Sequence, residues 1–217
     1  MKKLVTVGAS SYTGNYLLPR MLRNWEEVNP DTEIKLEITD SEDVFLQVQD
    51  GLIEVGLIGA CLESENVEAH EFTQNDQLIL IVPIGHDFAD RGEIEIDELR
   101  GEDFVLREPG SATRMWYREA FNRFKLTLDD LNVVAELDSH PAVITAVEAG
   151  SGLAMVPRHA ADDALDAGRV KELRIRELAP MTGSLYMIWP RTDSLSPQTR
   201  QFIDWLETER SSRPLRH

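Results

Sequence analysis

The chain has 217 residues, a formal net charge of −17 and a charged share of 28%, as in a globular protein with enough residues for one large or two small domains. The acidic balance argues against a nucleic-acid-binding surface on this chain, because phosphate backbones are bound by basic patches. The single cysteine, Cys61, excludes an internal disulfide and cannot form a metal site by itself, so we interpret it as a small buried apolar residue.

The longest apolar run, residues 78–84, suits a buried strand and is too short to cross a bilayer. The first residues, MKKLVTVGASS, contain an apolar stretch that is too short for a secretion signal and that begins a strand pattern at once. We therefore expect a cytoplasmic protein without a membrane partner.

The chain opens with a strand, a turn of small residues and a helix. Residues 4–7 alternate as in a strand, and apolar residues recur at helical spacing from Asn15 onward. The turn between them contains Ser10, Ser11 and Thr13. A helix start has unpaired N–H groups and a partial positive charge, so these hydroxyls would suit a carboxylate, sulfate or phosphate. The alternative is that Ser11 or Thr13 simply caps the helix.

The next elements complete a first α/β unit. They are a strand over 33–38 with period-two alternation, a helix that begins at Ser41 and ends near Gly51, and a mostly apolar strand over 52–59. This order of strands and helices predicts a doubly wound α/β unit.

A second unit of the same kind follows. Its first predicted elements are a strand at 78–83, a helical turn at 96–99, a strand at 104–106, a turn at 108–113 with Ser111 and Thr113, and a helix at 114–124. A strand at 133–137 follows, and then a helix that is capped by residues 138–141 and ends at Glu148. The remaining predicted elements are strands at 153–156, 170–175 and 185–189, a short helix after Arg158 and a C-terminal helix from near Pro197. Ligands of open α/β sheets bind beyond the carboxyl ends of the strands. If the two units face each other, the turns at 10–13 and 111–113 converge on one cleft and favour an anion.

No catalytic or cofactor motif is present in the sequence. The five histidines have no metal-ligand spacing, and we find no G-x-S-x-G elbow, no P-loop and no G-x-G-x-x-G after a strand. We therefore expect a protein that is not an enzyme and that has no cofactor and no metal.

Five segments in a fixed order carry a family resemblance over about residues 3–207. They are VGASSYTGNYLLPRMLRNWEEVNPDTEIKL, LQVQDGLIEVGLIG, LILIVPIGHDFA, FVLREPGSATR and HPAVITAVEAGSGLAMVPRHA. Together they resemble the effector-binding domain of the LysR-type transcriptional regulators. The resemblance implies an α/β fold like that of type 2 periplasmic binding proteins, in which each lobe is a doubly wound mixed sheet and two crossover strands join the lobes. By position, lobe one would be 1–82 plus 183–217 and lobe two 83–182, with crossovers at 78–83 and near 183–185.

The same resemblance implies where an effector would be contacted. The implied contacts are Ser10, Ser11, Thr13, Gly59, Ala60, Ser111, Ala112, Thr113, Arg114, Ser139 and His140. Three of them have ordinary alternatives: Thr113 as a helix cap, Arg114 as the partner of a surface acid, and His140 as a packed residue. Arg107 and Glu108 beside the second turn are ambiguous between a charge in the site and a hinge contact.

The resemblance also implies partners. The effector would be a small anionic metabolite or an inorganic anion, and the domain would form a homo-oligomer, a dimer or a tetramer. Family members begin with a winged helix-turn-helix and a linker helix that this sequence lacks, so DNA would be bound only through a missing N-terminal domain. The alternatives are a free-standing cytoplasmic binding protein or a transport receptor of the same fold, and an enzyme on the same scaffold.

Overall fold

The computed structural model describes residues 2–60, 62–192 and 195–212, without the side chains of 73–76 and 210–212. Cys61, interpreted above as a buried apolar residue, lies outside the described residues. The chain forms two compact units: unit 1 comprises residues 1–75 and 184–217, and unit 2 comprises residues 76–183.

Unit 1 is built on a parallel arrangement of three strands, in the order β2-β1-β3. Its elements are β1 (Lys3–Ser10), η1 (Thr13–Leu17), α1 (Leu18–Val28), β2 (Thr32–Thr39), α2 (Ser41–Gln49), β3 (Val55–Ile58), the first part of β4 (Val67–Pro83), most of β10 (Met181–Pro190) and α6 (Pro197–Ser212). β10 pairs with β3 in the antiparallel direction. The carboxyl ends of β1 and β3 therefore lie at the same edge of the sheet.

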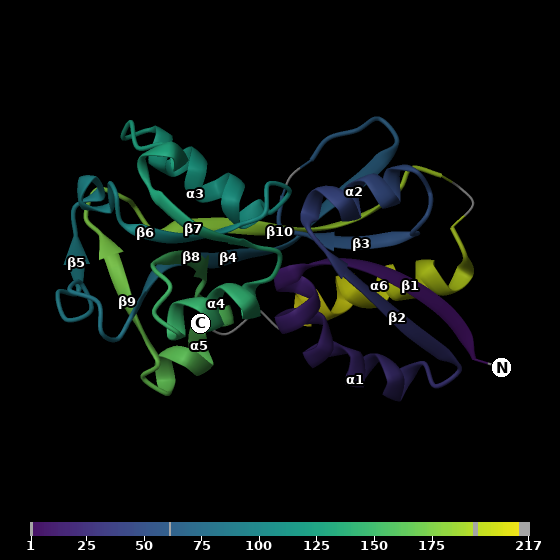
Figure 1. Cartoon of the computed structure of the whole chain (residues 1–217). Coiled ribbons are helices and arrows are strands. Elements are labelled where there is room, and N and C mark those ends of the chain that lie inside the picture. The colour runs from purple at the N-terminus through teal and green to yellow at the C-terminus, as the bar shows by residue number, and fades with distance from the viewer. Residues whose placement is uncertain (1, 61, 193–194, 213–217) are drawn as a thin grey trace. The chain divides into compact units, whose positions relative to one another are not determined.

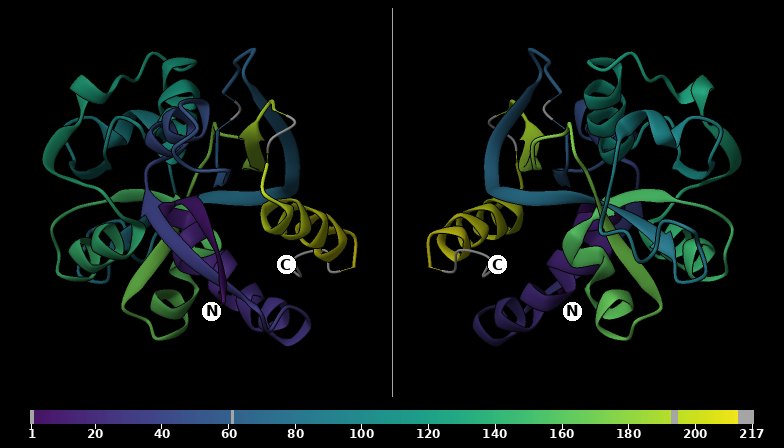
Figure 2. Two further views of the ribbon diagram at one scale, coloured as in Figure 1. Left: turned by 90° about the vertical axis from the view of Figure 1, so that its right-hand side faces the viewer. Right: turned by 90° about the vertical axis from the view of Figure 1, so that its left-hand side faces the viewer.

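Helices cover both faces of these strands, as predicted for a doubly wound unit (Figures 1 and 2). α2 packs closely on β1 and β3 because both strands have a glycine there: a Cβ on Gly8 or Gly56 would meet Val44 at 3.0 or 2.7 Å. On the other face, α1 and α6 meet through Trp25, whose ring contacts Phe202 edge-on at a centroid distance of 5.0 Å.

A partly buried carboxylate network fixes the start of α6. Glu54 precedes β3, and its carboxylate accepts hydrogen bonds from Ser196 Oγ at 2.7 Å, from the Ser196 N–H at 3.1 Å and from the Thr199 hydroxyl. Ser196 Oγ in turn accepts the Thr199 N–H at 3.2 Å. An acid at a helix N-terminus is stabilised by the unpaired N–H groups there. This network anchors the C-terminal helix on unit 1.

Unit 2 combines two sets of strands. Its elements are the second part of β4, β5 (Glu93–Ile94), η2 (Ile96–Leu99), β6 (Asp103–Arg107), α3 (Ala112–Asn122), η3 (Leu128–Asp130), β7 (Asn132–Leu137), α4 (His140–Glu148), β8 (Ala154–Pro157), α5 (Arg158–Asp166), β9 (Val170–Ile175) and the start of β10. β4 pairs with β8 and β9, β9 pairs with β5, and β6 and β7 form a parallel pair. The carboxyl ends of β6 and β7 share one edge.

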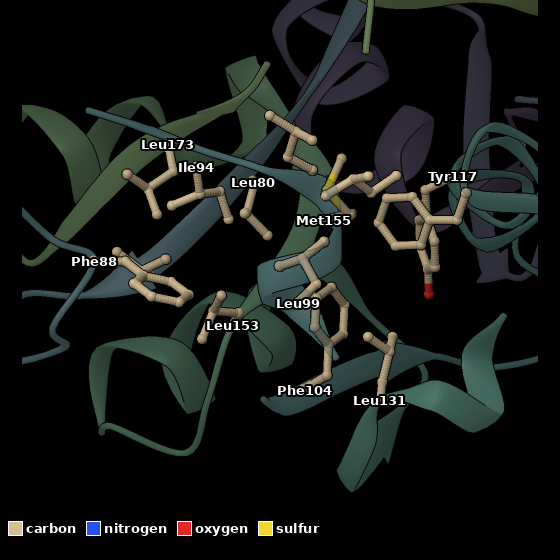
Figure 3. Close-up of a cluster of buried hydrophobic side chains, with 14 of the residues drawn as sticks. Leu80, Phe88, Ile94, Leu99, Phe104, Tyr117, Leu131, Leu153, Met155 and Leu173 are labelled. Atoms are coloured by element: carbon tan, nitrogen blue, oxygen red, sulfur yellow. The ribbon is translucent and has the colours of Figure 1, made fainter. Parts of the chain in front are cut away.

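A single large apolar cluster holds unit 2 together (Figure 3). It gathers Leu80 from β4, Phe104 from β6, Tyr117 from α3 and Met155 from β8, each no more than 2% exposed. Burying a large apolar side chain stabilises the folded state by about 1.5–3 kcal/mol. Trp116 packs at the margin of this cluster and covers Gly183, where a Cβ would overlap the indole ring.

The elements differ from their predicted bounds in several places. β1 extends to Ser10, and the helix begins at Ser11 rather than near Asn15, with the π-helical η1 from Thr13. β3 is shorter than predicted because residues 51–54 form a turn. β4 begins at Val67, well before Leu78, and the two-residue β5 was not predicted.

Candidate functional site

The unit 1 part of the candidate site lies where β1 ends. Ser10 is the last residue of β1, Ser11 follows it and Thr13 opens η1; all three are buried. Thr13 Oγ1 lies 2.8 Å from the carbonyl oxygen of Leu57 in β3, 3.0 Å from that of Ser10 and 3.1 Å from Ser10 Oγ. These contacts connect β1 to β3 through one hydroxyl.

The hydrogen-bond geometry separates the roles of Thr13 and Ser10. A hydroxyl has one proton, and the short contact to the Leu57 carbonyl takes the proton of Thr13. Thr13 therefore bonds to oxygen atoms only and does not cap a helix N-terminus. The Ser10 hydroxyl can turn its proton either to Thr13 or to a ligand. Of the two, Ser10 is the better placed for binding.

The turn that follows β1 is itself unusual. Residues Thr13–Leu17 form a π-helical turn with no side-chain cap, before the α-helix of α1. Single π-helical turns are rare in proteins, and those that occur are often found at functional sites. Gly14 allows this turn to approach β2, because a Cβ there would meet Ile38 at 2.7 Å.

Gly59 and Ala60 follow β3 at the same edge of the sheet. The Gly59 N–H donates to the hydroxyl of Ser41, the first residue of α2, at 3.2 Å. The start of α2 is capped by Asp40, which accepts the Asp43 N–H at 2.8 Å. The Gly59 N–H is therefore already hydrogen-bonded within unit 1, and this bond fixes the backbone after β3 to the start of α2.

The unit 2 part of the candidate site lies beyond β6 and β7, where α3 and α4 begin. Ser111 is the N-cap of α3, and its Oγ accepts the Arg114 N–H at 3.5 Å. Ser139 occupies the N-cap position of α4 but makes no side-chain cap hydrogen bond. Two helix N-termini therefore lie at one edge of the β6–β7 pair, with the Ser139 hydroxyl not used for capping.

A buried polar network joins these two helix starts. Arg107 is 2% exposed and donates to both carboxylate oxygens of Glu108, at 2.7 Å from Nε and 2.6 Å from Nη2. Its Nη1 lies 2.8 Å from both ring nitrogens of His140. His140 Nε2 lies 3.1 Å from Thr113 Oγ1. The network explains how Arg107 and Glu108, ambiguous in the sequence, are used: they form an ion pair inside unit 2.

Burial and a neighbouring positive charge favour the neutral form of His140. Burial, and secondly the nearby charge of Arg107, lower the pKa of His140 well below its usual value. His140 is 2% exposed and is the first residue of α4, where the helix dipole also disfavours a cation.

Arg114 is engaged within unit 2 as well. Its Nη1 donates to Glu136 Oε2 at 2.5 Å and to the Arg107 carbonyl at 2.6 Å. The structure thus shows the ion pair that was one of the two alternatives for this residue. The sequence signal for the network was the arginine that ends an otherwise apolar strand at 104–107. Its partners could not be read from the sequence.

Within the described ranges, no group of three or more His, Cys, Asp or Glu side chains is arranged to hold a metal ion. In the same part of the chain, none of the helices combines the length and apolarity of a membrane span.

Comparison with known proteins identifies the family. The model of the LysR substrate binding domain matches residues 2–211. The uncharacterized HTH-type transcriptional regulator MJ0300 of Methanocaldococcus jannaschii is 32% identical over 203 residues, which cover 94% of this chain and 68% of that protein. The chain thus spans about two thirds of this relative.

Two solved structures are similar over nearly their whole length. The regulatory domain of Synechocystis PCC6803 CcmR, in complex with 2-PG, is 25% identical with a TM-score of 0.83 over 95% of this chain and 97% of that one. The effector binding domain of QuiR, in complex with shikimate, is 15% identical and shows the fold alone, with a TM-score of 0.85 over 99% of this chain and all of that one. The chain therefore belongs to the LysR substrate-binding domain family, with the type 2 periplasmic-binding-protein-like fold, and is the effector-binding domain of a transcriptional regulator rather than an enzyme.

Proposed function

We propose that the effector of this domain is a small anion or carboxylate. Its contacts would come from the residues at the carboxyl ends of the parallel strands in each unit, namely Ser10, Ser11, Thr13, Gly59, Ala60, Ser111, Thr113, Arg114, Ser139 and His140. The observation that supports this most is the pair of helix N-termini at one edge of β6 and β7, where the Ser139 hydroxyl is not used for capping.

The charges of the site residues narrow the chemistry. Arg107 is paired with Glu108, and Arg114 with Glu136, so neither guanidinium brings an uncompensated positive charge. A ligand anion would instead be met by hydroxyl groups and by backbone N–H groups at helix starts, as uncharged donors. This favours a compact oxyanion or carboxylate that uncharged donors can surround.

We also propose that the domain works in a cytoplasmic homo-oligomer, a dimer or a tetramer. Effector binding would change the arrangement of its subunits and so re-aim DNA-binding domains carried outside this chain. An effector can drive such a change only through different affinities for the two arrangements. Light scattering at high protein concentration tests the oligomer, and a strict monomer would contradict it.

A thermal-shift screen tests the effector site. The purified chain is heated with sulfate, phosphate, shikimate and 2-PG, the last two because QuiR and CcmR were solved with them. A ligand at about a hundred times its dissociation constant stabilises the folded state by about 2.7 kcal/mol, or roughly 5–10 °C for a chain of this size.

Matched serine variants locate the site. Ser10→Ala and Ser139→Ala should each reduce the shift, whereas Ser151→Ala, an exposed serine after α4, should leave it unchanged. Loss of the shift in a variant would mean that the effector depends on the residues of that unit. A shift that survives both would refute the proposed site.

A further inference from the structure

Arg107 stands apart from the other arginines of the described residues because it is buried. It ends β6, is 2% exposed, and is bound in bidentate fashion by Glu108 through Nε and Nη2. A buried guanidinium is stable only when its charge is matched, and Glu108 does this within the same turn. The remaining nitrogen, Nη1, is directed to a group on a different element.

That group is the imidazole of His140 at the start of α4. Nη1 lies 2.8 Å from both ring nitrogens, and Nη2 donates to the Asp138 carbonyl at 3.3 Å. Arg107 thus contacts the turn before α4 at the backbone carbonyl of Asp138, and it contacts the side chain of His140, the first residue of α4. Both contacts fix the position of the helix start relative to the end of β6.

The same imidazole also contacts a hydroxyl group on α3. His140 Nε2 lies 3.1 Å from Thr113 Oγ1, and no other hydrogen bond to this hydroxyl is found among the described residues. This hydrogen bond therefore joins the first turn of α3 to the first residue of α4. One buried arginine connects the first turns of both helices that carry the unit 2 site residues.

After burial, the charge of Arg107 is the second cause that disfavours the cationic form of the imidazole. An imidazolium has no lone pair to accept a hydrogen bond and would face a guanidinium at 2.8 Å inside the protein. Two other acids near this turn are paired with arginines, Glu108 with Arg107 and Glu136 of β7 with Arg114 of α3, and the carboxylate of Asp138 lies two residues before His140 in the sequence. Burial and the charge of Arg107 accordingly lower the pKa of His140.

We propose that Arg107 is a positioning residue of the effector site: without touching the effector, it holds the His140 ring against Thr113 and opposes a positive charge on that ring. The site then presents the same neutral donors from mildly acidic to mildly basic conditions. A cationic His140, in contrast, would attract any anion and reduce selectivity. The effect of Arg107 on His140 stands by itself, and only its consequence for binding rests on the proposed function.

The direct test is a nitrogen NMR titration of the histidine side chains between about pH 5.5 and 8. His140→Asn assigns the His140 signals by their loss. In the unaltered chain we expect His140 to stay neutral over the whole range. In the double variant Arg107→Gln, Glu108→Gln, which removes both charges and keeps the net charge, we expect its titration midpoint to rise by about one pH unit or more.

A matched control is the double variant Arg91→Gln, Glu98→Gln, which removes an exposed bidentate ion pair of the same unit. It should leave His140 neutral. A folded Arg107 and Glu108 variant in which His140 titrates as in the unaltered chain would overturn the proposal. So would protonation of His140 above about pH 5.5 in the unaltered chain, which needs no variant to fold.

Sulfate, which stays fully ionised over this range, tests the consequence for binding. As the pH falls, the affinity of sulfate for the unaltered chain should change less than twofold. Its affinity for the Arg107 and Glu108 variant should rise about tenfold, because one positive charge at short range raises the logarithm of the binding constant by about one unit. If His140 behaves as expected but sulfate binds neither protein, the anion proposal fails and the positioning role stands. Equal pH dependence in both proteins would refute the link to binding.

Discussion

The replacement Thr13→Val tests whether the hydroxyl of this buried threonine joins β1 to β3. Valine keeps the branched shape of threonine and removes only the hydroxyl, which is fully buried and bonds to the Leu57 carbonyl at 2.8 Å. The replacement therefore removes the side-chain link between β1 and β3 while leaving the backbone pairing of the strands in place.

The expected cost follows from the contacts that are lost. A buried hydrogen bond contributes about 1 kcal/mol net, and a buried acceptor left without its donor costs about 1–3 kcal/mol. We expect Thr13→Val to lower the free energy of unfolding by about 2 kcal/mol, or the melting temperature by roughly 4–8 °C. Urea unfolding and calorimetry at neutral pH measure both quantities.

Two comparisons make this result interpretable. Thr208→Val removes an exposed hydroxyl that bonds to the Asp204 carbonyl within α6, and should change stability by less than about 0.5 kcal/mol. Ser10→Ala should cost about 1 kcal/mol or less but weaken effector binding. If Thr13→Val is as stable as the unaltered chain, the hydroxyl does not join the strands, and our separation of Thr13 from Ser10 is wrong.

Three further predictions concern His140, Glu54 and Gly183. The depressed pKa of His140 means that its contribution to stability is present above its unfolded pKa and lost as the pH falls, so the unaltered chain should lose stability as the pH falls through the unfolded-state pKa of histidine, about 6.5, and His140→Asn should remove this loss in urea titrations at each pH. Burial alone would raise the pKa of Glu54, but the hydrogen bonds from Thr199 and Ser196 outweigh it and lower the pKa. Glu54→Gln should therefore lower the free energy of unfolding by about 1 kcal/mol at neutral pH. The difference between the two proteins should vanish below about pH 4, where the carboxyl of the unaltered chain is protonated. An equal loss of stability at all pH values would contradict this. Gly183→Ala should destabilise unit 2 by about 1–3 kcal/mol by overlap with an indole ring, and Trp116→Ala in the same chain should recover part of the loss; a neutral Gly183→Ala would show that the contact is loose.

Much of the fold could be predicted because its signals are local. The period-two pattern at 33–38 gave a strand that the structure places at Thr32–Thr39, and the caps around Ser41 and Ser139 marked helices that begin at Ser41 and His140. The prediction was wrong where local preference competes with longer-range pairing. β4 starts at Val67 rather than Leu78, because pairing with strands far along the chain extends it through polar residues that have no strand pattern of their own.

The candidate site shows the same division. The turns with Ser10 and Ser111 were recognisable as helix starts after strands, because small and hydroxyl residues at that place are a local signal. The π-helical turn at Thr13–Leu17 was not predicted, since nothing in the spacing of its residues distinguishes it from an ordinary helix start.

By itself, the sequence determined the order of strands and helices, the family, and the turns where a ligand is expected, since these depend on residues near one another in the chain. Only the tertiary structure decided what each polar side chain does there. The partner of Thr13 lies 44 residues away at Leu57, and the partner of Arg107 lies 33 residues away at His140. Hydrogen bonds and burial depend on which strand ends the fold brings together, and that is a property of packing rather than of local sequence.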